Sequence, residues 1–137
     1  MSTIATTWTP WARRALVLAA LCSAGACGSD SLSPFQPQVA NPADNFQLQA
    51  TNVKNVSSTT TYAWVNTGTR ATVNHSTTTT AGSALVVIKD AAGIMVYSSA
   101  LSPSLNEATV AGQPGNWSIQ LTLASYSGTL NFRAQKL

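Results

Sequence analysis

Apolar and polar side chains alternate along the last part of the chain. Residues 117–124, with the sequence WSIQLTLA, place a tryptophan, an isoleucine and two leucines at every second position. Because successive side chains leave a strand on opposite faces, this pattern predicts a strand that buries one face. The alternation returns at residues 130–134, after the segment SYSG at 125–128. We therefore expect the two segments to pair as a hairpin around that turn.

A second hairpin is predicted upstream. Residues 84–89 (ALVVIK) and 94–99 (IMVYSS) are rich in valine and isoleucine. The segment between them, DAAG, ends on a glycine that tolerates a positive φ. Further short segments of strand character lie at 46–53, 60–66, 70–76 and 106–112.

These segments define the expected fold class. About eight short strands in about 90 residues are a normal content for a two-sheet antiparallel β-sandwich. Outside the N-terminal region, no segment has a clear helical period. We predict an all-β, jelly-roll-like sandwich over residues 45–137, with an isolated barrel as the alternative.

The first 26 residues have the layout of a secretory signal peptide. Arg13 and Arg14 precede the apolar run ALVLAALCSAGA at 15–26, and no acidic residue occurs before Asp30. This run of about 12 residues is short of the roughly 20 that a membrane-spanning helix needs. We therefore expect residues 1–26 to be removed on export.

Removal of this segment changes the charge of the chain. The whole sequence has seven basic and four acidic residues, and two of the basic residues lie in the signal segment. The remaining cations are scattered singly: Lys54, Arg70, Lys89, Arg133 and Lys136. Because nucleic-acid binding needs a basic cluster or stripe, the sequence argues against a nucleic-acid partner.

Residues 27–44 are predicted to form a flexible linker. After Cys27 the sequence reads GSDSLSPFQPQVANPAD, which is rich in serine, proline, asparagine and glutamine. Such a composition buries too little apolar surface to fold by itself. The expected organisation is a signal peptide at 1–26, a linker at 27–44 and one folded domain at 45–137.

The segment AGAC at residues 24–27 resembles the lipobox of bacterial lipoproteins. In that family a small residue precedes a cysteine that is diacylated on sulfur, with fatty acids such as palmitate, and that becomes the new N-terminus. The resemblance implies a lipid on Cys27 that anchors the mature chain to a bacterial membrane. Because Gly28 and not aspartate follows the cysteine, the resemblance favours the outer membrane.

Two alternatives to lipidation involve the same residues. Ala24-Gly25-Ala26 is also an ordinary A-x-A cleavage site, which would release a soluble protein that begins at Cys27. A disulfide between Cys22 and Cys27 is disfavoured because Cys22 would leave with the signal segment. The expected domain has no cysteine, so its stability must come from packing.

Few residues of the chain after Cys27 are suited to acid–base chemistry. His75 is the only histidine, and we expect it to be exposed and inert. Asp90 opens the turn of the second hairpin, where a carboxylate binds backbone N–H groups, and Glu107 is expected to be a solvated strand-edge residue. Asp44 falls at the end of the linker. The sequence therefore predicts no catalytic residue, no metal site and no cofactor, and it favours a non-enzymatic protein.

The aromatic residues supply the candidate ligand-binding positions. Trp117 and Phe132 share the alternation of the aliphatic residues, so we expect them in the core. Tyr62 and Trp64 lie on the same face of one expected strand, and Tyr126 lies in a turn. If these three rings are exposed, they can stack on a sugar ring or anchor a protein. They define the alternative function, a carbohydrate-binding module.

Two segments within residues 83–137 contain distinctive turns. GQPGNWSIQLTLASYSGTLNFRAQKL has a Gly-x-Trp turn before one strand and Ser-Gly-Thr-Leu before the next, and SALVVIKDAAGIMVYSS is a strand, an Asp-x-x-Gly turn and a strand. The first segment resembles the closing part of the jelly-roll-like accessory sandwiches found beside secreted bacterial peptidases, and the second is similar to a strand–turn–strand unit of the same sandwiches. The resemblance implies an accessory role in binding or stabilisation.

Together these predictions describe a lipid-anchored, extracytoplasmic β-sandwich of the bacterial cell envelope. Its expected role is that of a non-enzymatic binding or structural accessory protein. The expected partners are the membrane, through the lipid on Cys27, and an envelope protein or a carbohydrate.

Overall fold

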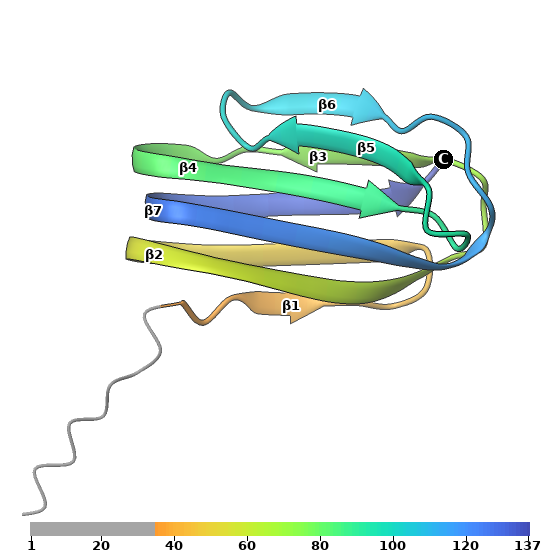
Figure 1. The fold of residues 1–137 in the computed structure, drawn as a ribbon, viewed down its shortest axis with the longest axis horizontal. Helices are drawn as coiled ribbons and strands as arrows, with labels where there is room; N and C mark the ends of the chain where they lie inside the picture. Colours follow the sequence, from red (N-terminus) through yellow and green to blue (C-terminus); the bar gives the residue numbers. More distant parts are fainter. Residues whose placement is uncertain (1–34) are drawn as a thin grey trace, which may run out of the picture.

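The computed structural model describes residues 35–137 and arranges them in seven strands (Figure 1). The predicted signal peptide and Cys27 lie outside the described residues. The strands are β1 (Gln38–Ala40), β2 (Asn45–Asn66), β3 (Ala71–His75), β4 (Thr78–Lys89), β5 (Met95–Ala100), β6 (Leu105–Ala108) and β7 (Gly115–Lys136). Every strand pair is antiparallel, and none of residues 35–137 is helical. The all-β prediction is confirmed.

Strands β2 and β7 pair with each other along their whole length. The register runs from Asn45 opposite Gln135 to Asn66 opposite Gly115, and it shifts three times between residues 50 and 58 of β2. Such shifts are β-bulges, which bend a strand and increase its twist. The bend folds this two-stranded ribbon back over itself, so each strand runs along the molecule twice (Figure 1).

The bend has a local conformational cause. Asn55 (φ 48°) and Ser125 (φ 47°) adopt the left-handed conformation, and Gly128 has a φ of 145° that L-residues avoid. Side-chain hydroxyls bind backbone N–H groups where the ladder is interrupted. The Asn55 N–H donates to Ser127 Oγ (2.9 Å), and the Ser125 N–H donates to Ser57 Oγ (2.8 Å).

The folded ribbon forms the centre of both layers of a β-sandwich. In the first layer, residues 45–50 of β2 and 130–135 of β7 are flanked by β1 on one side and by β3 and β6 on the other. In the second layer, residues 58–66 of β2 and 115–124 of β7 are extended by β4 and β5. All seven strands belong to one sheet, which the bend divides into two layers. The predicted antiparallel sandwich is the observed architecture.

The structure corrects the expected number of strands. Residues 117–124 and 130–134, which the sequence predicts as the arms of a hairpin, are the two halves of β7. The hairpin prediction is wrong because residues 125–128 bend the strand without reversing it, and each half pairs with β2 and not with the other half. The segments at 46–53 and 60–66 likewise form one strand, β2. The structure therefore has seven strands in place of about eight.

The hairpin predicted between residues 84 and 99 is confirmed. Strands β4 and β5 pair from Leu85 opposite Ala100 to Lys89 opposite Met95. Gly93 in the connecting turn has a φ of 78°, as the turn requires.

Part of the predicted linker belongs to the sheet. Residues 38–40 form β1, which pairs with residues 47–49 of β2. The side-chain amide of Asn41 then donates to the backbone carbonyl of Ala63 in the second layer (2.6 Å). All three residues of β1 are exposed, so backbone hydrogen bonds and not side-chain burial hold this strand. Composition alone therefore gave no sign of it, and the sheet begins before residue 45.

The core lies between the two layers. Its largest fully buried side chains include Trp64 and Trp117, which face each other across β2 and β7. Their ring centroids are 5.8 Å apart and their planes make an angle of 85°, an edge-to-face arrangement that aromatic pairs favour. Trp117 also donates its indole N–H to the Gln113 carbonyl (2.7 Å). The two tryptophans are thus the part of the core that β2 and β7 contribute near one end of the second layer.

Replacement of Gly128 tests the close packing at the bend. A Cβ added at Gly128 would overlap the Thr78 carbonyl of β4, whereas one added at Gly93 would meet no atom within 4 Å. We expect Gly128→Ala to lower the free energy of unfolding by more than about 3 kcal/mol. Gly93→Ala should cost only about 1 kcal/mol, for its positive φ. Urea unfolding followed by tryptophan fluorescence measures both, and equal effects would contradict this packing.

Candidate binding surface

The three aromatic candidates do not share an exposed surface. Trp64 is 1% exposed in the core, and Tyr126 is fully buried. The Tyr126 hydroxyl lies within hydrogen-bonding distance of the Thr78 and Thr129 carbonyls (3.3 and 3.1 Å), which share its one hydrogen. Only Tyr62 is partly exposed. These three residues therefore form no exposed platform for stacking on a sugar. The Trp64 side chain points from β2 into the core, and Tyr126 lies inside the bend.

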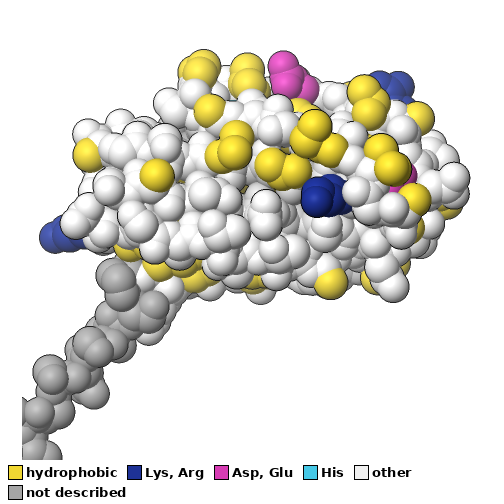
Figure 2. All heavy atoms as spheres, in the orientation of Figure 1, with side chains coloured by type: hydrophobic (Ala, Val, Ile, Leu, Met, Phe, Trp, Pro, Cys, Tyr) yellow, Lys and Arg dark blue, Asp and Glu magenta, His cyan; other side chains and the backbone are white. Residues whose placement is uncertain are grey.

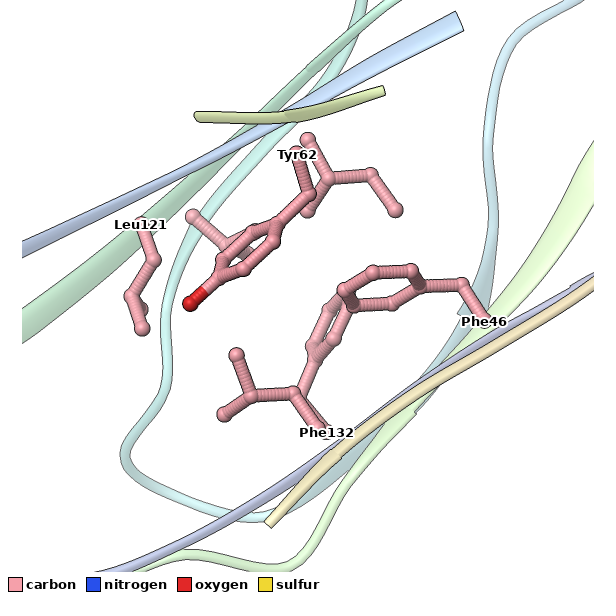
Figure 3. A pocket seen from close by; sticks show the side chains of 7 residues that line it. Phe46, Tyr62, Leu121 and Phe132 are labelled. Carbon is pink, nitrogen blue, oxygen red and sulfur yellow. The ribbon is translucent and has the colours of Figure 1, made fainter. Parts of the chain in front are cut away.

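Tyr62 contributes to a small apolar gap between the layers (Figure 3). Its ring packs at a centroid distance of 5.5 Å from Phe46, and Phe132 and Leu121 lie around them. The gap has a volume of about 10 Å³. A space of that size is at the lower limit for one water molecule, and it has no polar groups to bind one. The gap is an imperfection of core packing and has no room for a ligand.

His75 is buried, contrary to the expectation of an exposed imidazole. Its side chain points to the same side of β3 as that of Val73, toward the core, and it is 1% exposed. Neither ring nitrogen has a hydrogen-bond partner among the described residues. Burial lowers the pKa of His75, while the nearby Leu101 backbone and the Glu107 carboxylate raise it in part. The imidazole is thus held neutral inside the sandwich.

The expected structural role of Asp90 is confirmed. Its Oδ1 accepts hydrogen bonds from the N–H groups of Ala92 (3.0 Å) and Ile94 (2.8 Å), and its Oδ2 accepts one from Gln113 (2.8 Å). The bond from Gln113 contributes most to lowering the pKa of Asp90; burial opposes it, and the other two bonds reinforce it. The carboxylate holds the β4–β5 turn against the loop before β7.

Asp44 and Glu107 have separate partners. Asp44 pairs with Lys136 (2.9 Å) and accepts hydrogen bonds from Thr67. The bond from Lys136, followed by those from Thr67, lowers the pKa of Asp44 to about 2. Glu107 is exposed on β6, as expected, with the Tyr97 hydroxyl 3.5 Å away. The structure therefore places Glu107 close enough to His75 for its charge to raise the pKa of the imidazole, but no contact among the described residues joins either of them to Asp44 or Asp90.

Within residues 35–137, no group of three or more histidine, cysteine or acidic side chains could hold a metal ion. The same residues include no helix of the length and hydropathy needed to cross a membrane.

The outer face of the first layer is rich in side-chain amides. Alternate residues of five strands point outward there, because their neighbours face the core. We call this surface the amide face; its amide residues are Gln38, Asn45, Gln47, Gln49, Asn74, Asn106, Asn131 and Gln135. These eight amides are not needed for solubility, since threonine or lysine would serve.

The strand register places these residues in rows. One row runs across the layer through Gln47, Arg133, Asn74 and Asn106 on β2, β7, β3 and β6. Neighbouring strands are about 4.8 Å apart, and outward positions along one strand are about 6.8 Å apart. The result is a flat array of groups that both donate and accept hydrogen bonds.

The amide side chains have almost no partners within residues 35–137. The one hydrogen bond among them joins Arg133 Nη2 to Gln47 Oε1 at 3.4 Å. Arg133 is the only charged side chain of the face in this part of the chain, and no described carboxylate pairs with it. The array is therefore free to bind a partner from solution.

A polar hollow adjoins the amide face near the bend. It has a volume of about 160 Å³, lies between β1 and β2 and is lined by Gln36, Gln38, Gln49, Ala50 and Thr51. Because Gln38 and Gln49 belong to the face, the hollow extends the polar surface beyond its rows.

The outer face of the second layer has a different composition. Hydroxyl side chains of β2 and β7 lie there beside Leu85 and Val87 of β4 and Met95 of β5. Leu85 is 41% exposed and Met95 58% exposed. Figure 2 shows this side of the molecule, on which apolar side chains are interspersed with neutral polar ones. The concentration of amides is therefore a property of the first layer alone.

Reasoning from the sequence did not find the amide face. A signal was present, because the polar phase of the alternation is QxQ at 47–49 and NxRxQ at 131–135. The register that sets β3 and β6 beside these segments is needed to recognise a single surface.

The sequence has no relative from which a function can be transferred. No protein-family model matches the sequence, and none of the curated proteins is similar to it. The function must be argued from the residues themselves.

Burial of His75 makes the stability of the domain depend on pH. Because its folded-state pKa is lowered, the neutral ring stabilises the fold fully above the unfolded pKa of about 6.5. This contribution is lost as the pH falls below that value, when the unfolded chain takes up the proton first. We expect the Tm to fall between pH 7.5 and 5.5, a range in which Asp44, with its pKa of about 2, does not titrate.

A His75→Leu variant should lose this dependence, while Asn74→Leu, on the outward side of β3, should keep it. Thermal unfolding followed by circular dichroism at a series of pH values measures the difference. A His75→Leu variant whose Tm varies with pH as strongly as that of the parent would contradict the assignment.

Proposed function

We propose that the chain is a lipid-anchored, non-enzymatic accessory protein of the bacterial cell envelope, and that the amide face is its binding surface. In this proposal Cys27 carries the lipid and attaches the chain to a membrane, with the outer membrane favoured. The β-sandwich then holds the amide face toward another component of the envelope.

The observation that carries the proposal is the composition of the amide face. Asparagine is depleted in β-strands, because its side chain competes for backbone hydrogen bonds and favours turns. Three of the eight amides that face outward are nevertheless asparagines within β3, β6 and β7, namely Asn74, Asn106 and Asn131. A surface that only had to be solvated would not need them. Their presence favours recognition of a partner by hydrogen bonds.

The position of the amide face relative to Cys27 supports the same proposal. Gln38 of the face lies on β1, the first strand of the described residues. Cys27 and Phe35 are eight residues apart in the sequence, and a chain of that length spans at most about 29 Å. A lipid on Cys27 would therefore keep the face close to the membrane surface, where envelope polymers are attached.

Lipidation is tested by the intact mass of the protein purified from bacterial membranes. The parent chain should begin at Cys27 and carry the added mass of a diacylglyceryl group. Cys27→Ala should lack that mass, whereas Cys22→Ala should have the same mature mass as the parent, because Cys22 is removed with the signal peptide. An unmodified parent that begins at Cys27 would refute the anchor and indicate a soluble exported domain.

The role of the amide face is tested by sedimentation of the lipidated chain, held in detergent micelles, with envelope material from the producing bacterium. The double variant Gln47→Ala/Asn74→Ala removes two amides of one row, and we expect it to bind roughly tenfold more weakly. Thr61→Ala/Gln120→Ala makes a matched change on the second layer and should bind like the parent. Unchanged Tm values would show that both variants are folded. Loss of binding in the second-layer variant alone would refute the role of the amide face.

A further inference from the structure

The chemistry of the amide face suits a partner with many hydroxyl groups. Each amide offers two N–H donors and one carbonyl acceptor, and a hydroxyl offers one donor and two lone pairs. Either group can therefore satisfy the other in more than one orientation. A regular array of amides can follow a chain of hydroxyl-bearing units without requiring a single register.

Other classes of macromolecule fit the face less well. Protein interfaces are centred on aromatic, methionine and other apolar side chains. Among the described residues, most exposed large apolar side chains lie away from the amide rows: Val65, Leu85 and Met95 in the second layer, Ile94 in the β4–β5 turn and Val110 in the loop after β6. Val39 is on β1 but lies opposite Leu48, on the core side of the layer, and Leu137 follows the end of β7. Nucleic acids require a track of cations, whereas the described part of the face has a single cation, Arg133. These observations favour a carbohydrate.

The one charge of the face adds a second requirement. Arg133 lies between Gln47 and Asn74 in the same row, and its only described side-chain partner is the Gln47 amide at 3.4 Å. A guanidinium group binds a carboxylate through two parallel hydrogen bonds, and such pairs are stronger than neutral ones. Asp44, which precedes the first amide of β2, is already occupied by Lys136 and Thr67. Because no described carboxylate pairs with Arg133, its exposed guanidinium is available to a carboxylate of a partner.

We infer that the amide face binds a carbohydrate chain that bears carboxylate groups. A carboxylate of the chain binds Arg133, and hydroxyl groups of the neighbouring sugar units bind the amides beside it. This inference rests on the proposed function and names the chemical class of its partner. It assigns sugar recognition to hydrogen bonds on the first layer and not to the buried rings of Trp64 and Tyr126.

Isothermal titration of the lipidated chain in micelles tests the inference. The carboxylated probes are oligosaccharides of alginate, polygalacturonate and hyaluronate, and the uncharged probe is dextran of similar length, all at one ionic strength. We expect at least one carboxylated probe to bind roughly tenfold more tightly than dextran. Arg133→Gln keeps a hydrogen-bonding side chain but removes the charge, and it should abolish this preference. Gln47→Ala/Asn74→Ala should weaken binding of that probe, while Thr61→Ala/Gln120→Ala should not.

The contrary outcomes separate this inference from the function on which it rests. If Gln47→Ala/Asn74→Ala loses binding to envelope material but no carboxylated probe binds the parent, the carbohydrate inference fails and the binding role of the face stands. If Arg133→Gln has the same preference as the parent, the assignment of the carboxylate to Arg133 is wrong. If sedimentation equilibrium shows a dimer that the double variant loses, the face pairs with a second copy and the inference is overturned. Failure of both the envelope and the probe experiments would refute both proposals.

Discussion

The structure depends on the pairing of β2 with β7 along their whole length. Each strand supplies hydrogen-bond partners to both layers, so the layers are joined by the backbone as well as by the core. The bulges between residues 50 and 58, with Gly128 opposite them, turn the ribbon back over itself. Once that bend is formed, the inward side chains of the first halves of β2 and β7 face those of the second halves. The core forms between these two sets of side chains.

The charged groups of the sandwich are used mainly to secure its ends. Asp90 binds three backbone N–H groups around the β4–β5 turn, and Asp44 joins the start of β2 to Lys136 at the end of β7. These contacts leave the flat outer faces with few charges. Because the strands beneath the amide face are held by the core, its side chains are presented on a rigid surface, and little order has to be created on binding.

The period-two alternation was enough to predict an all-β sandwich and the hairpin of β4 and β5. It also identified the core side, since Trp117 and Phe132 are buried. It could not separate a bend from a reversal at residues 125–128, because serine, tyrosine and glycine are compatible with both. Nor could it find β1, whose exposed residues are held by backbone hydrogen bonds to an edge of β2.

For the candidate site, the sequence by itself determined which side chains alternate outward and how few of them are charged. It also predicted that Asp90 binds backbone N–H groups within its own turn, whereas the bond from Gln113 depends on the tertiary structure. Only the tertiary structure decided that His75 and Tyr126 are buried and that amides from five strands form one surface. The physical reason is that alternation specifies the two sides of a strand, whereas long-range pairing specifies which strands lie side by side and which of those sides faces the core.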